Sequence, residues 1–177
     1  MLEGKLVNLR IMEREDLPIL LEWNNHPEFY GENLPLIQQS KTDLEKDFDK
    51  RPPEAKMFFV EKKNGTKIGI IAHFLTGQLW EIGYVMTQEE RGKGYCSEAV
   101  KIMVDYLFLS KEMVRIQAVT DVRNEASQKV LEKVGFKKEG TIRKSAFFRG
   151  KWADWFLYSI LREEWKEPRI LTRTPRK

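Results

Sequence analysis

A glycine-rich turn directly before an amphipathic segment is the feature that most limits how this chain can fold. The stretch "QEERGKGYCSEAV", residues 88–100, contains Arg-Gly-Lys-Gly just where helical periodicity begins. Glycine allows a positive φ and a close approach of the main chain to another group. The first turn of a helix offers unpaired N–H groups and a partial positive charge. The stretch therefore predicts a strand–loop–helix unit whose loop holds an anionic group, most naturally a phosphate.

The composition is that of a globular protein with one core. The chain has 177 residues, of which 41% are hydrophobic and 33% charged, which is typical of a single domain of ordinary size. No apolar run approaches the roughly 18 residues of a spanning helix, and the first ten residues lack a signal-peptide core. We therefore expect a cytoplasmic protein without a membrane segment. Cys96 is the only cysteine, so we predict neither an internal disulfide nor a metal site.

The net charge of +4 is located at the C-terminal end. The last twelve residues, "KEPRILTRTPRK", carry five cations and one anion, which accounts for the whole surplus and leaves residues 1–165 neutral. We interpret 1–165 as a single domain and 166–177 as a basic tail that forms a solvated end. A tail that docks on ribosomal RNA is the alternative, and such binding would depend steeply on salt. Nucleic acid is otherwise not an expected partner.

Hydrophobic periodicity predicts seven strands and four helices, with no internal repeat. The strands are expected at 6–12, on both sides of a turn at 64–65, at 79–86, at 114–122, at 141–148 and at 152–162. The helices are expected at 13–25, from 41 to about 50, from 95 to about 109, and at 124–134. This order indicates an α+β fold with a mostly antiparallel mixed sheet and one strand–loop–helix–strand crossover in its middle.

Local signals support several of these boundaries. Ser40 followed by Asp43 resembles a capping box at the start of the second helix. The Asn64-Gly65 pair between two β-rich runs is a strong hairpin signal. Gly135 is a typical residue just after a helix end.

Three common phosphate-binding loops do not match the glycine-rich turn. The dinucleotide fingerprint requires Gly-x-Gly-x-x-Gly, but Ser97 stands three residues after Gly94, and no βαβ unit opens the chain. The nucleoside-triphosphate loop requires Gly-x-x-x-x-Gly-Lys-Ser/Thr, which "GKGYCS" does not supply. Kinase-type loops lie within a hairpin rather than before a helix.

A fourth loop matches. The stretch "YVMTQEERGKGYCSEAV" resembles the coenzyme A loop of the GCN5-related N-acetyltransferases, the GNAT superfamily, whose signature is Gln/Arg-x-x-Gly-x-Gly/Ala. The stretch "NEASQKVLEKVGFKKEGTIRKSAFFRGKWADWFLYSI" resembles the branch that contains the ribosomal-protein-alanine acetyltransferases. The resemblance covers nearly the whole chain, with Glu89 at the Gln/Arg position as a departure. It implies the GNAT fold and direct transfer of an acetyl group from acetyl-CoA to a primary amine in a ternary complex.

The resemblance also implies where coenzyme A binds. Main-chain amides of the loop would wrap its pyrophosphate, and exposed backbone of the preceding strand would pair with its pantetheine arm. The residues concerned are Tyr84, Val85, Met86, Arg91, Gly92, Lys93, Gly94, Tyr95, Cys96 and Asn124. Simpler interpretations stay open: a plain core strand, solvated side chains for the two loop cations, and Asn124 as a helix cap.

Acetyl transfer to an amine needs a base for the ammonium, whose pKa is ~10, and a donor for the leaving sulfur. Many family members place a tyrosine acid where this chain has Leu131, so that phenol is absent. By resemblance, Ser127 is the candidate acid or thiolate hydrogen-bond donor, with an ordinary helical serine as the alternative. Glu81 is the candidate base, because a carboxylate on a central strand is costly unless it is paired or functional. A structural partner to arginine or backbone is its alternative role.

Three further groups are interpreted as non-catalytic. Cys96 at a helix start invites a thiolate mechanism, but in the family this position carries small residues packed against the cofactor. Asp154 and Tyr158 match family positions, and we expect structural roles for both.

The segment "WNNHPEFYGENLPL", residues 23–36, lies where the family gates its acceptor. Trp23, His26, Phe29 and Tyr30 are the candidate acceptor-binding residues, with aromatic capping of the core as the alternative. The resemblance favours the N-terminal α-amine of a protein such as a ribosomal protein. A polyamine or an aminoglycoside-like amine is the second candidate, and a non-catalytic coenzyme A-binding module is the third. Family members often dimerise, so the resemblance also allows a homodimer.

Overall fold

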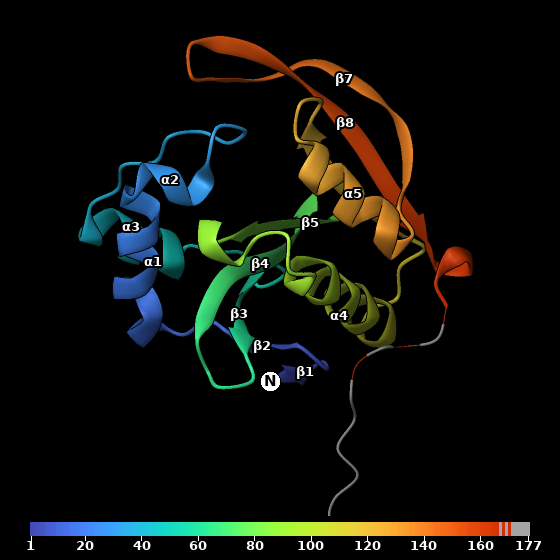
Figure 1. Cartoon of the computed structure of the whole chain (residues 1–177), viewed down its shortest axis with the longest axis horizontal. Helices are drawn as coiled ribbons and strands as arrows, with labels where there is room; N and C mark the ends of the chain where they lie inside the picture. The colour runs from blue at the N-terminus through green and yellow to red at the C-terminus, as the bar shows by residue number, and fades with distance from the viewer. Residues whose placement is uncertain (167, 169, 171–177) are drawn as a thin grey trace, which may run out of the picture.

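The computed structural model describes residues 1–166, 168 and 170, and its elements follow the expected order (Figure 1). The strands are β1 (Leu2–Glu3), β2 (Val7–Ile11), β3 (Lys56–Lys62), β4 (Lys67–Thr76), β5 (Leu79–Met86), β6 (Arg115–Asp121), β7 (Lys137–Phe148) and β8 (Lys151–Leu161). The α-helices are α1 (Leu17–Asn25), α2 (Pro27–Tyr30), α3 (Lys41–Asp49), α4 (Tyr95–Ser110) and α5 (Glu125–Val134). Short 3₁₀ helices are η1 (Arg14–Asp16), η2 (Gln88–Glu90) and η3 (Arg162–Glu164). Most of the basic tail predicted at 166–177 lies outside the described residues.

In this part of the chain, eight strands form one mixed sheet in the order β1-β2-β3-β4-β5-β6-β8-β7. Every neighbouring pair is antiparallel except β5 and β6, which run parallel on either side of the α4 crossover. The predicted α+β fold with a mostly antiparallel sheet is therefore confirmed. The predicted numbers of strands and helices, seven and four, are each one lower than the eight strands and five α-helices of the described chain. The missed elements, β1 and α2, are two and four residues long, too short to show a hydrophobic period.

β5 and β6 are the only parallel pair in the described sheet, and they are paired over fewer residues than the neighbouring central strands. β5 and β6 pair at Trp80↔Ile116 and Glu81↔Gln117 and then separate. On its other edge β5 stays paired with β4 along its whole length, from Thr76↔Leu79 to Gly69↔Met86. The backbone of β5 beyond Glu81 therefore has a partner strand on one side and a gap on the other.

The sheet separates two apolar cores. Helices α4 and α5 cover one face, where Val100, Met103, Leu107 and Leu131 pack on strand residues such as Val7 and Ile71. Helices α1, α2 and α3 cover the other face, where Leu20, Phe29 and Leu44 pack on Phe59 and Ile70. Figure 1 shows the two groups of helices on opposite sides of the central strands. No helix of the described chain has both the length and the apolarity needed to cross a membrane.

Strands β7 and β8 form a long hairpin that arches over the end of the molecule (Figure 1). β7 starts at Lys137 rather than at the predicted residue 141, and its register shifts twice along β8. At the tip, Arg149 and Gly150 both have positive φ values, 50° and 75°. The tip lies beside the segment that follows α2, because Arg149 forms hydrogen bonds to the carbonyl oxygens of Gly31 and Leu34.

Candidate active site

The loop between β5 and α4 has the backbone that its glycines predict. Gly92 (φ 75°) and Gly94 (φ 85°) are left-handed, and Gly94 is the N-cap of α4. Within residues 1–166, 168 and 170, no side chain caps this helix start, and no neighbouring atom lies within 4 Å of where a Cβ would stand on either glycine. Among the described residues, none accepts a hydrogen bond from the main-chain amides of residues 92–97. The loop therefore offers free N–H groups to open space, as an anion-binding turn requires.

Arg91 is held by the protein itself. Its Nη2 donates to the carbonyl oxygen of Phe29 at 2.8 Å, and its Nε donates to that of Met86 at 3.1 Å. Its amide donates to the carbonyl oxygen of Gln88 at 3.3 Å. Arg91 is exposed, as the interpretation of a solvated loop cation implies, but its guanidinium also ties α2 to the end of β5. The free amides of the loop begin at Gly92.

Lys93 and Cys96 occupy contrasting environments. Lys93 Nζ forms an exposed ion pair with Glu90 Oε2 at 3.0 Å, so its side chain is a surface cation. Burial raises the pKa of the Cys96 thiol to about 12, against a smaller opposing effect of the Arg91 charge. A thiol in this state does not ionise at neutral pH, which argues against Cys96 as a nucleophile.

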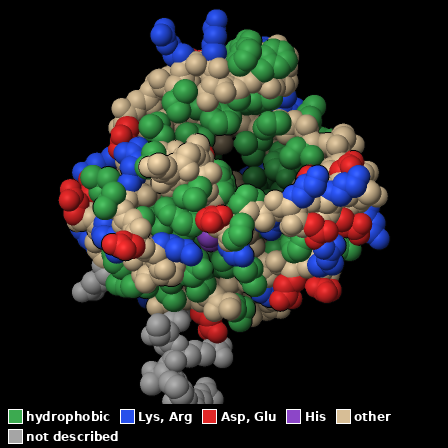
Figure 2. Space-filling model, turned by 180° about the vertical axis from the view of Figure 1, so that it is seen from behind, with side chains coloured by type: hydrophobic (Ala, Val, Ile, Leu, Met, Phe, Trp, Pro, Cys, Tyr) green, Lys and Arg blue, Asp and Glu red, His purple; other side chains and the backbone are tan. Residues whose placement is uncertain are grey.

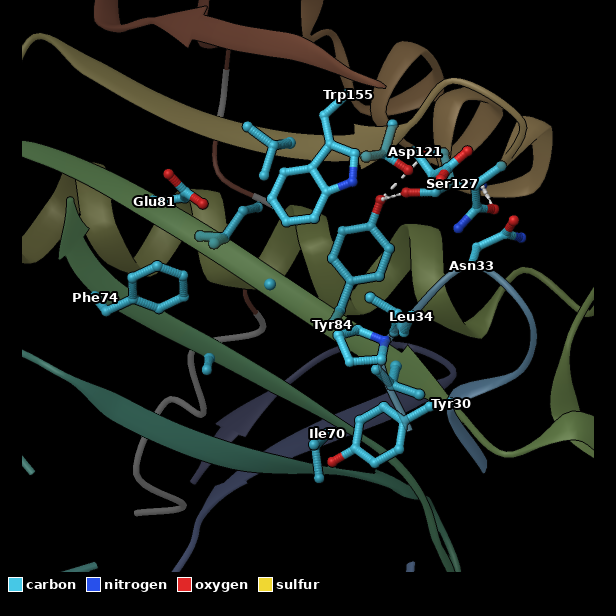
Figure 3. Close-up of a pocket in the computed structure, with 18 of the residues that line it drawn as sticks. Tyr30, Asn33, Leu34, Ile70, Phe74, Glu81, Tyr84, Asp121, Ser127 and Trp155 are labelled. Atoms are coloured by element: carbon cyan, nitrogen blue, oxygen red, sulfur yellow. Dashed lines mark hydrogen bonds between the residues drawn. The ribbon is translucent and has the colours of Figure 1, made fainter. Parts of the chain in front are cut away.

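A cavity of about 390 Å³ opens between the sheet and the segment that follows α2 (Figure 3). Its walls come from β4 and β5, the end of β6, the start of α5, β8 and the segment 30–37. The lining residues are Tyr30, Asn33, Leu34, Pro35, Ile37, Ile70, Ala72, Phe74, Glu81, Ile82, Gly83, Tyr84, Val85, Val119, Thr120, Asp121, Asn124, Ser127 and Trp155. Figure 2 shows a hollow below the hairpin that is bordered mainly by hydrophobic side chains.

The register of β4 and β5 builds the floor of this cavity. The pairs Ile70↔Val85, Ala72↔Gly83 and Phe74↔Glu81 lie opposite each other, and paired residues project from the same face of a sheet. All six line the cavity. Glu81 therefore shares a face with Gly83 and Val85, as the two-residue alternation predicts.

The cavity also continues through the gap between β5 and β6. Ile82 and Tyr84 project from the opposite face of β5, yet both line it, together with Asn124 and Ser127 at the start of α5. This is possible because β6 leaves β5 after Glu81. The cavity thus connects the side of the sheet under α1–α3 with the side that carries α4 and α5.

Glu81 is a nearly buried carboxylate, 8% exposed, at the point where the two strands separate. Its Oε2 accepts a hydrogen bond from Gln117 Nε2 at 2.8 Å. None of the described cations forms an ion pair with it. In Figure 3 its carboxylate lies above Phe74 and to the left of Trp155. Within the described chain, the cavity wall therefore carries a carboxylate without a cationic partner.

Asn124, Ser127 and Tyr84 form a hydrogen-bonded group on the other side of the gap. Asn124 is the N-cap of α5, and its Oδ1 accepts from the Ser127 amide at 3.1 Å. The Tyr84 hydroxyl lies 2.9 Å from Ser127 Oγ (Figure 3). Burial raises the pKa of Tyr84 well above its ordinary value, so the phenol stays protonated. Asn124 has the capping role that its position favours, and Ser127 is held between two partners.

The four aromatic and histidine candidates of the acceptor segment are only partly brought together. Tyr30 lines the cavity. Trp23 stacks on Phe29, with ring centroids 4.7 Å apart, in the core under α1–α3. His26 is exposed and is the N-cap of α2. The structure therefore puts Trp23, His26 and Phe29 outside the cavity lining. Trp23 and Phe29 pack in the core instead.

Several lining residues were not singled out from the sequence, although Asn33, Leu34 and Pro35 lie within the segment 23–36 that was predicted to gate the acceptor. Asn33, Leu34, Pro35 and Ile37 belong to the irregular segment after α2, and Trp155 belongs to β8. The apolar residues of "ENLPLI" were a usable signal, because a loop with three aliphatic side chains and a proline is unusually apolar. Trp155 carried no such signal, because an aromatic residue in a strand is ordinary.

The segment after α2 is fastened to the hairpin tip. Arg149 Nη2 donates to the carbonyl oxygen of Gly31 at 2.6 Å, and Arg149 Nε donates to that of Leu34 at 3.3 Å. These bonds cross 118 and 115 residues of sequence. Since Leu34 lines the cavity, Arg149 holds one of its walls in place.

Other predicted positions have structural surroundings. Leu131, which stands where the resemblance implies a tyrosine in many family members, is fully buried in the core. Asp154 Oδ1 accepts from the Lys144 amide at 2.7 Å inside the hairpin, and the Tyr158 hydroxyl donates to Glu132 Oε1 at 3.0 Å. Among the described residues, no cluster of His, Cys, Asp or Glu could hold a metal ion.

Comparison with known proteins agrees with this geometry. Residues 7–137 match the family model described as "Acetyltransferase (GNAT) domain". The putative ribosomal N-acetyltransferase YdaF of Bacillus subtilis is 36% identical over 86 residues, 49% of this chain and 47% of the relative. The spermidine N(1)-acetyltransferase of Escherichia coli is 26% identical over 156 residues, 82% of this chain and 81% of the relative. The chain belongs to the GNAT acetyltransferase family, and it is an acetyl-CoA-dependent N-acetyltransferase.

A solved structure of the family has the same fold. The GNAT-family acetyltransferase from Bacillus anthracis superimposes with a TM-score of 0.78 at 26% sequence identity, covering 93% of this chain and 100% of that one. The predicted GNAT fold is thereby confirmed, with the differences in element number noted above.

Proposed function

We propose that this enzyme passes an acetyl group directly from bound acetyl-CoA to a primary amine in the cavity, and that the amine is the N-terminal α-amine of a protein. The cavity carries the proposal, because it extends from the β4–β5 floor through the strand gap to Asn124 and Ser127. A thioester that enters from the α4–α5 side would meet an amine that enters from the α1–α3 side.

The residues present suit coenzyme A at two places. The free amides of residues 92–97 suit its diphosphate, with the α4 dipole behind them. The edge of β5 that has lost its partner strand suits the pantetheine arm, which would pair with it as an added strand does. Acetyl-CoA supplies the activated acyl group and the sulfur leaving atom. Because these contacts use the main chain, Glu89 at the Gln/Arg position of the family signature does not count against binding.

Glu81 suits the role of base. The acceptor amine has a pKa of ~10 and must lose a proton before or during attack. As the nitrogen–carbon bond forms and the carbon–sulfur bond breaks, the surplus proton of the amine passes to the Glu81 carboxylate, directly or through a water molecule. The absence of a cationic partner among the described residues leaves this carboxylate free to accept it.

Ser127 suits stabilisation of the leaving sulfur. The Tyr84 hydroxyl lies 2.9 Å from Ser127 Oγ and 3.3 Å from the Ser127 carbonyl oxygen, and either hydroxyl can be the donor in the shorter contact. When Tyr84 donates to Ser127 Oγ, the proton of the serine hydroxyl is free to form a hydrogen bond to the sulfur. The raised pKa of the Tyr84 phenol keeps it a donor. Ser127 and Tyr84 thus stand in for the phenol that Leu131 does not provide.

Two classes of acceptor find support among the relatives. The printed name of YdaF and the branch resemblance favour a protein α-amine. The spermidine acetyltransferase of Escherichia coli makes a polyamine the second candidate.

Mass spectrometry of a peptide and amine library incubated with acetyl-CoA tests the proposal. We expect acetylated product with at least one primary amine, and full retention of activity in Cys96→Ala. Glu81→Gln should lower kcat/KM at pH 7 by roughly 100-fold or more, with partial recovery at higher pH, where the amine deprotonates unaided. The exposed α1 variant Glu22→Gln is the matched control. Tight coenzyme A binding without product from any amine, or an acetylated Cys96, would contradict the proposal.

A further inference from the structure

The two tyrosines of the cavity are neutral. The Tyr30 hydroxyl donates to Asn24 Oδ1 at 2.6 Å, and burial raises the pKa of Tyr30 to about 12. The Tyr84 hydroxyl is bonded to Ser127 in the gap. Neither phenol therefore offers a negative charge to a bound cation at neutral pH.

The charge of Asp121 is already matched. Its Oδ1 accepts from Arg123 Nε and from the Arg123 amide, both at 2.8 Å, and its Oδ2 accepts from Arg123 Nη2 at 2.7 Å. These bonds lower the pKa of Asp121 and keep it ionised next to its counter-ion. A ligand ammonium gains little from a carboxylate that an arginine holds by both oxygens.

Glu81 is thus the one carboxylate on the described cavity wall without a cationic partner. Glu28 and Glu32, which the sequence offers as further acidic residues near the acceptor, are both exposed and do not line the cavity. Most other lining side chains are apolar or carry no charge. The apolar ones are Leu34, Pro35, Ile37, Ile70, Ala72, Ile82, Val85, Val119, Phe74 and Trp155.

From this distribution we infer that the acceptor carries a single primary amine on an uncharged, apolar body, as in a peptide whose first side chain is aliphatic or aromatic, and that polyamines are poor substrates. The inference rests on the proposed function and specifies its acceptor. One ammonium can lie at Glu81, while its apolar body contacts the aliphatic walls. A second ammonium on the same body would lie among apolar side chains without a counter-ion, which is strongly unfavourable.

A matched pair of amines tests the inference. Pentylamine and 1,5-diaminopentane have the same carbon chain and differ by one amine. We expect kcat/KM for pentylamine to exceed that for the diamine by at least roughly 100-fold, since desolvating an unpaired ammonium costs several kcal/mol. Among peptides of one length, an N-terminal leucine should likewise be preferred to an N-terminal lysine. Equal use of the two amines, or preference for the diamine or spermidine, would overturn the inference and leave the proposed function standing.

A second carboxylate in the wall should relax the selection. Leu34→Glu is expected to raise kcat/KM for 1,5-diaminopentane at least tenfold relative to pentylamine, because it supplies the missing counter-ion. Leu36→Glu is the control, since Leu36 lies two residues away, is 58% exposed and does not line the cavity. An unchanged ratio in Leu34→Glu would count against the inference. No acetylation of any amine by the unmodified enzyme would instead overturn the proposed function, and the inference with it.

Discussion

The phenol oxygen of Tyr84, on β5, lies 2.9 Å from the hydroxyl oxygen of Ser127, on α5, across the gap where β5 and β6 separate. The two residues are 43 positions apart in the chain. A tyrosine therefore reaches the start of α5 from the sheet, whereas the helix itself presents the buried Leu131 at the position where the family resemblance led us to look for a phenol. The pair leads directly to the first prediction.

Removing either hydroxyl should slow the reaction, and removing both should cost little more than removing the serine alone. Ser127→Ala is expected to lower kcat roughly 100-fold, as loss of a positioned donor does. Tyr84→Phe is expected to lower it about tenfold, because one hydrogen bond orients the serine. Steady-state kinetics of the two single variants and the double variant check this. Tyr106→Phe, a partly buried position on α4 outside the cavity lining, is the control. Strictly additive losses would contradict the coupling.

Gly94→Arg should abolish stabilisation by coenzyme A without unfolding the protein. Gly94 has a φ of 85° and open space around its Cβ position. The arginine therefore lowers the free energy of unfolding by about 1–2 kcal/mol, because a non-glycine residue is unfavourable in this conformation, and its long side chain lies over the free amides. Thermal unfolding with and without coenzyme A measures the effect.

Gly77→Arg is the matched control for Gly94→Arg. Gly77, in the β4–β5 turn, also has a positive φ, 62°, and nothing within 4 Å of its Cβ position. It should lose similar stability and keep the full shift with coenzyme A. A normal shift in Gly94→Arg would mean that the diphosphate binds elsewhere.

Arg149→Ala should weaken acceptor binding and leave coenzyme A binding unchanged. Arg149 holds the carbonyl oxygens of Gly31 and Leu34, so its loss frees one wall of the cavity. We expect the acceptor KM to rise about tenfold, in line with the loss of hydrogen bonds from a charged group. Arg143→Ala, on the exposed part of the same hairpin, should behave like the unmodified enzyme. An unchanged acceptor KM in Arg149→Ala would show that the bonds do not shape the cavity.

His73 should make the fold less stable as the pH falls from about 6.5 to about 4. Burial, with a smaller contribution from the charge of Lys111, lowers the pKa of His73 from 6.5 to about 4. Below pH 6.5 the unfolded chain binds a proton that the folded chain does not, so the free energy of unfolding decreases across this window. The expected loss is about 2 kcal/mol at pH 4.5.

Denaturant titrations at pH 7 and pH 4.5 measure the contribution of His73. In His73→Phe the difference between the two unfolding free energies should shrink by that amount, because phenylalanine does not titrate and suits a site beside Phe58 and Trp80. His26→Gln, at an exposed position, should leave the difference unchanged. The same difference in His73→Phe and in the unmodified protein would contradict the assignment.

Elements with a strong local signal were predicted close to their observed bounds. The β3–β4 hairpin forms around Asn64-Gly65, because Gly65 adopts the positive φ (85°) that the turn needs. The Ser40 hydroxyl caps α3 by accepting from the Asp43 amide at 3.1 Å. Helix α5 ends at Gly135, which has a φ of 111°. In each case the residue that identifies the turn or helix end in the sequence also forms it in the structure, through its own backbone conformation or its own hydrogen bond.

The glycine-rich loop was predictable for the same reason, but the role of its arginine was not. A positive φ at Gly92 and Gly94 is a requirement of the turn itself. The acceptors of the Arg91 guanidinium include the carbonyl of Phe29, 62 residues earlier. No local pattern indicates that contact, since it exists only once α2 packs against the end of β5.

The sequence by itself thus determined the order of strands and helices along the chain, the helix caps and the loop that suits a phosphate. Each of these depends on residues within a few positions of one another. Tertiary structure alone decided the cavity, which joins Leu34, Glu81, Ser127 and Trp155 from four separate segments. It also decided that Tyr84 meets Ser127 and that Glu81 has no cationic partner within the described chain. Such relations arise when β6 diverges from β5 and opens a gap, and the divergence follows from the packing of the whole sheet rather than from any one stretch of sequence.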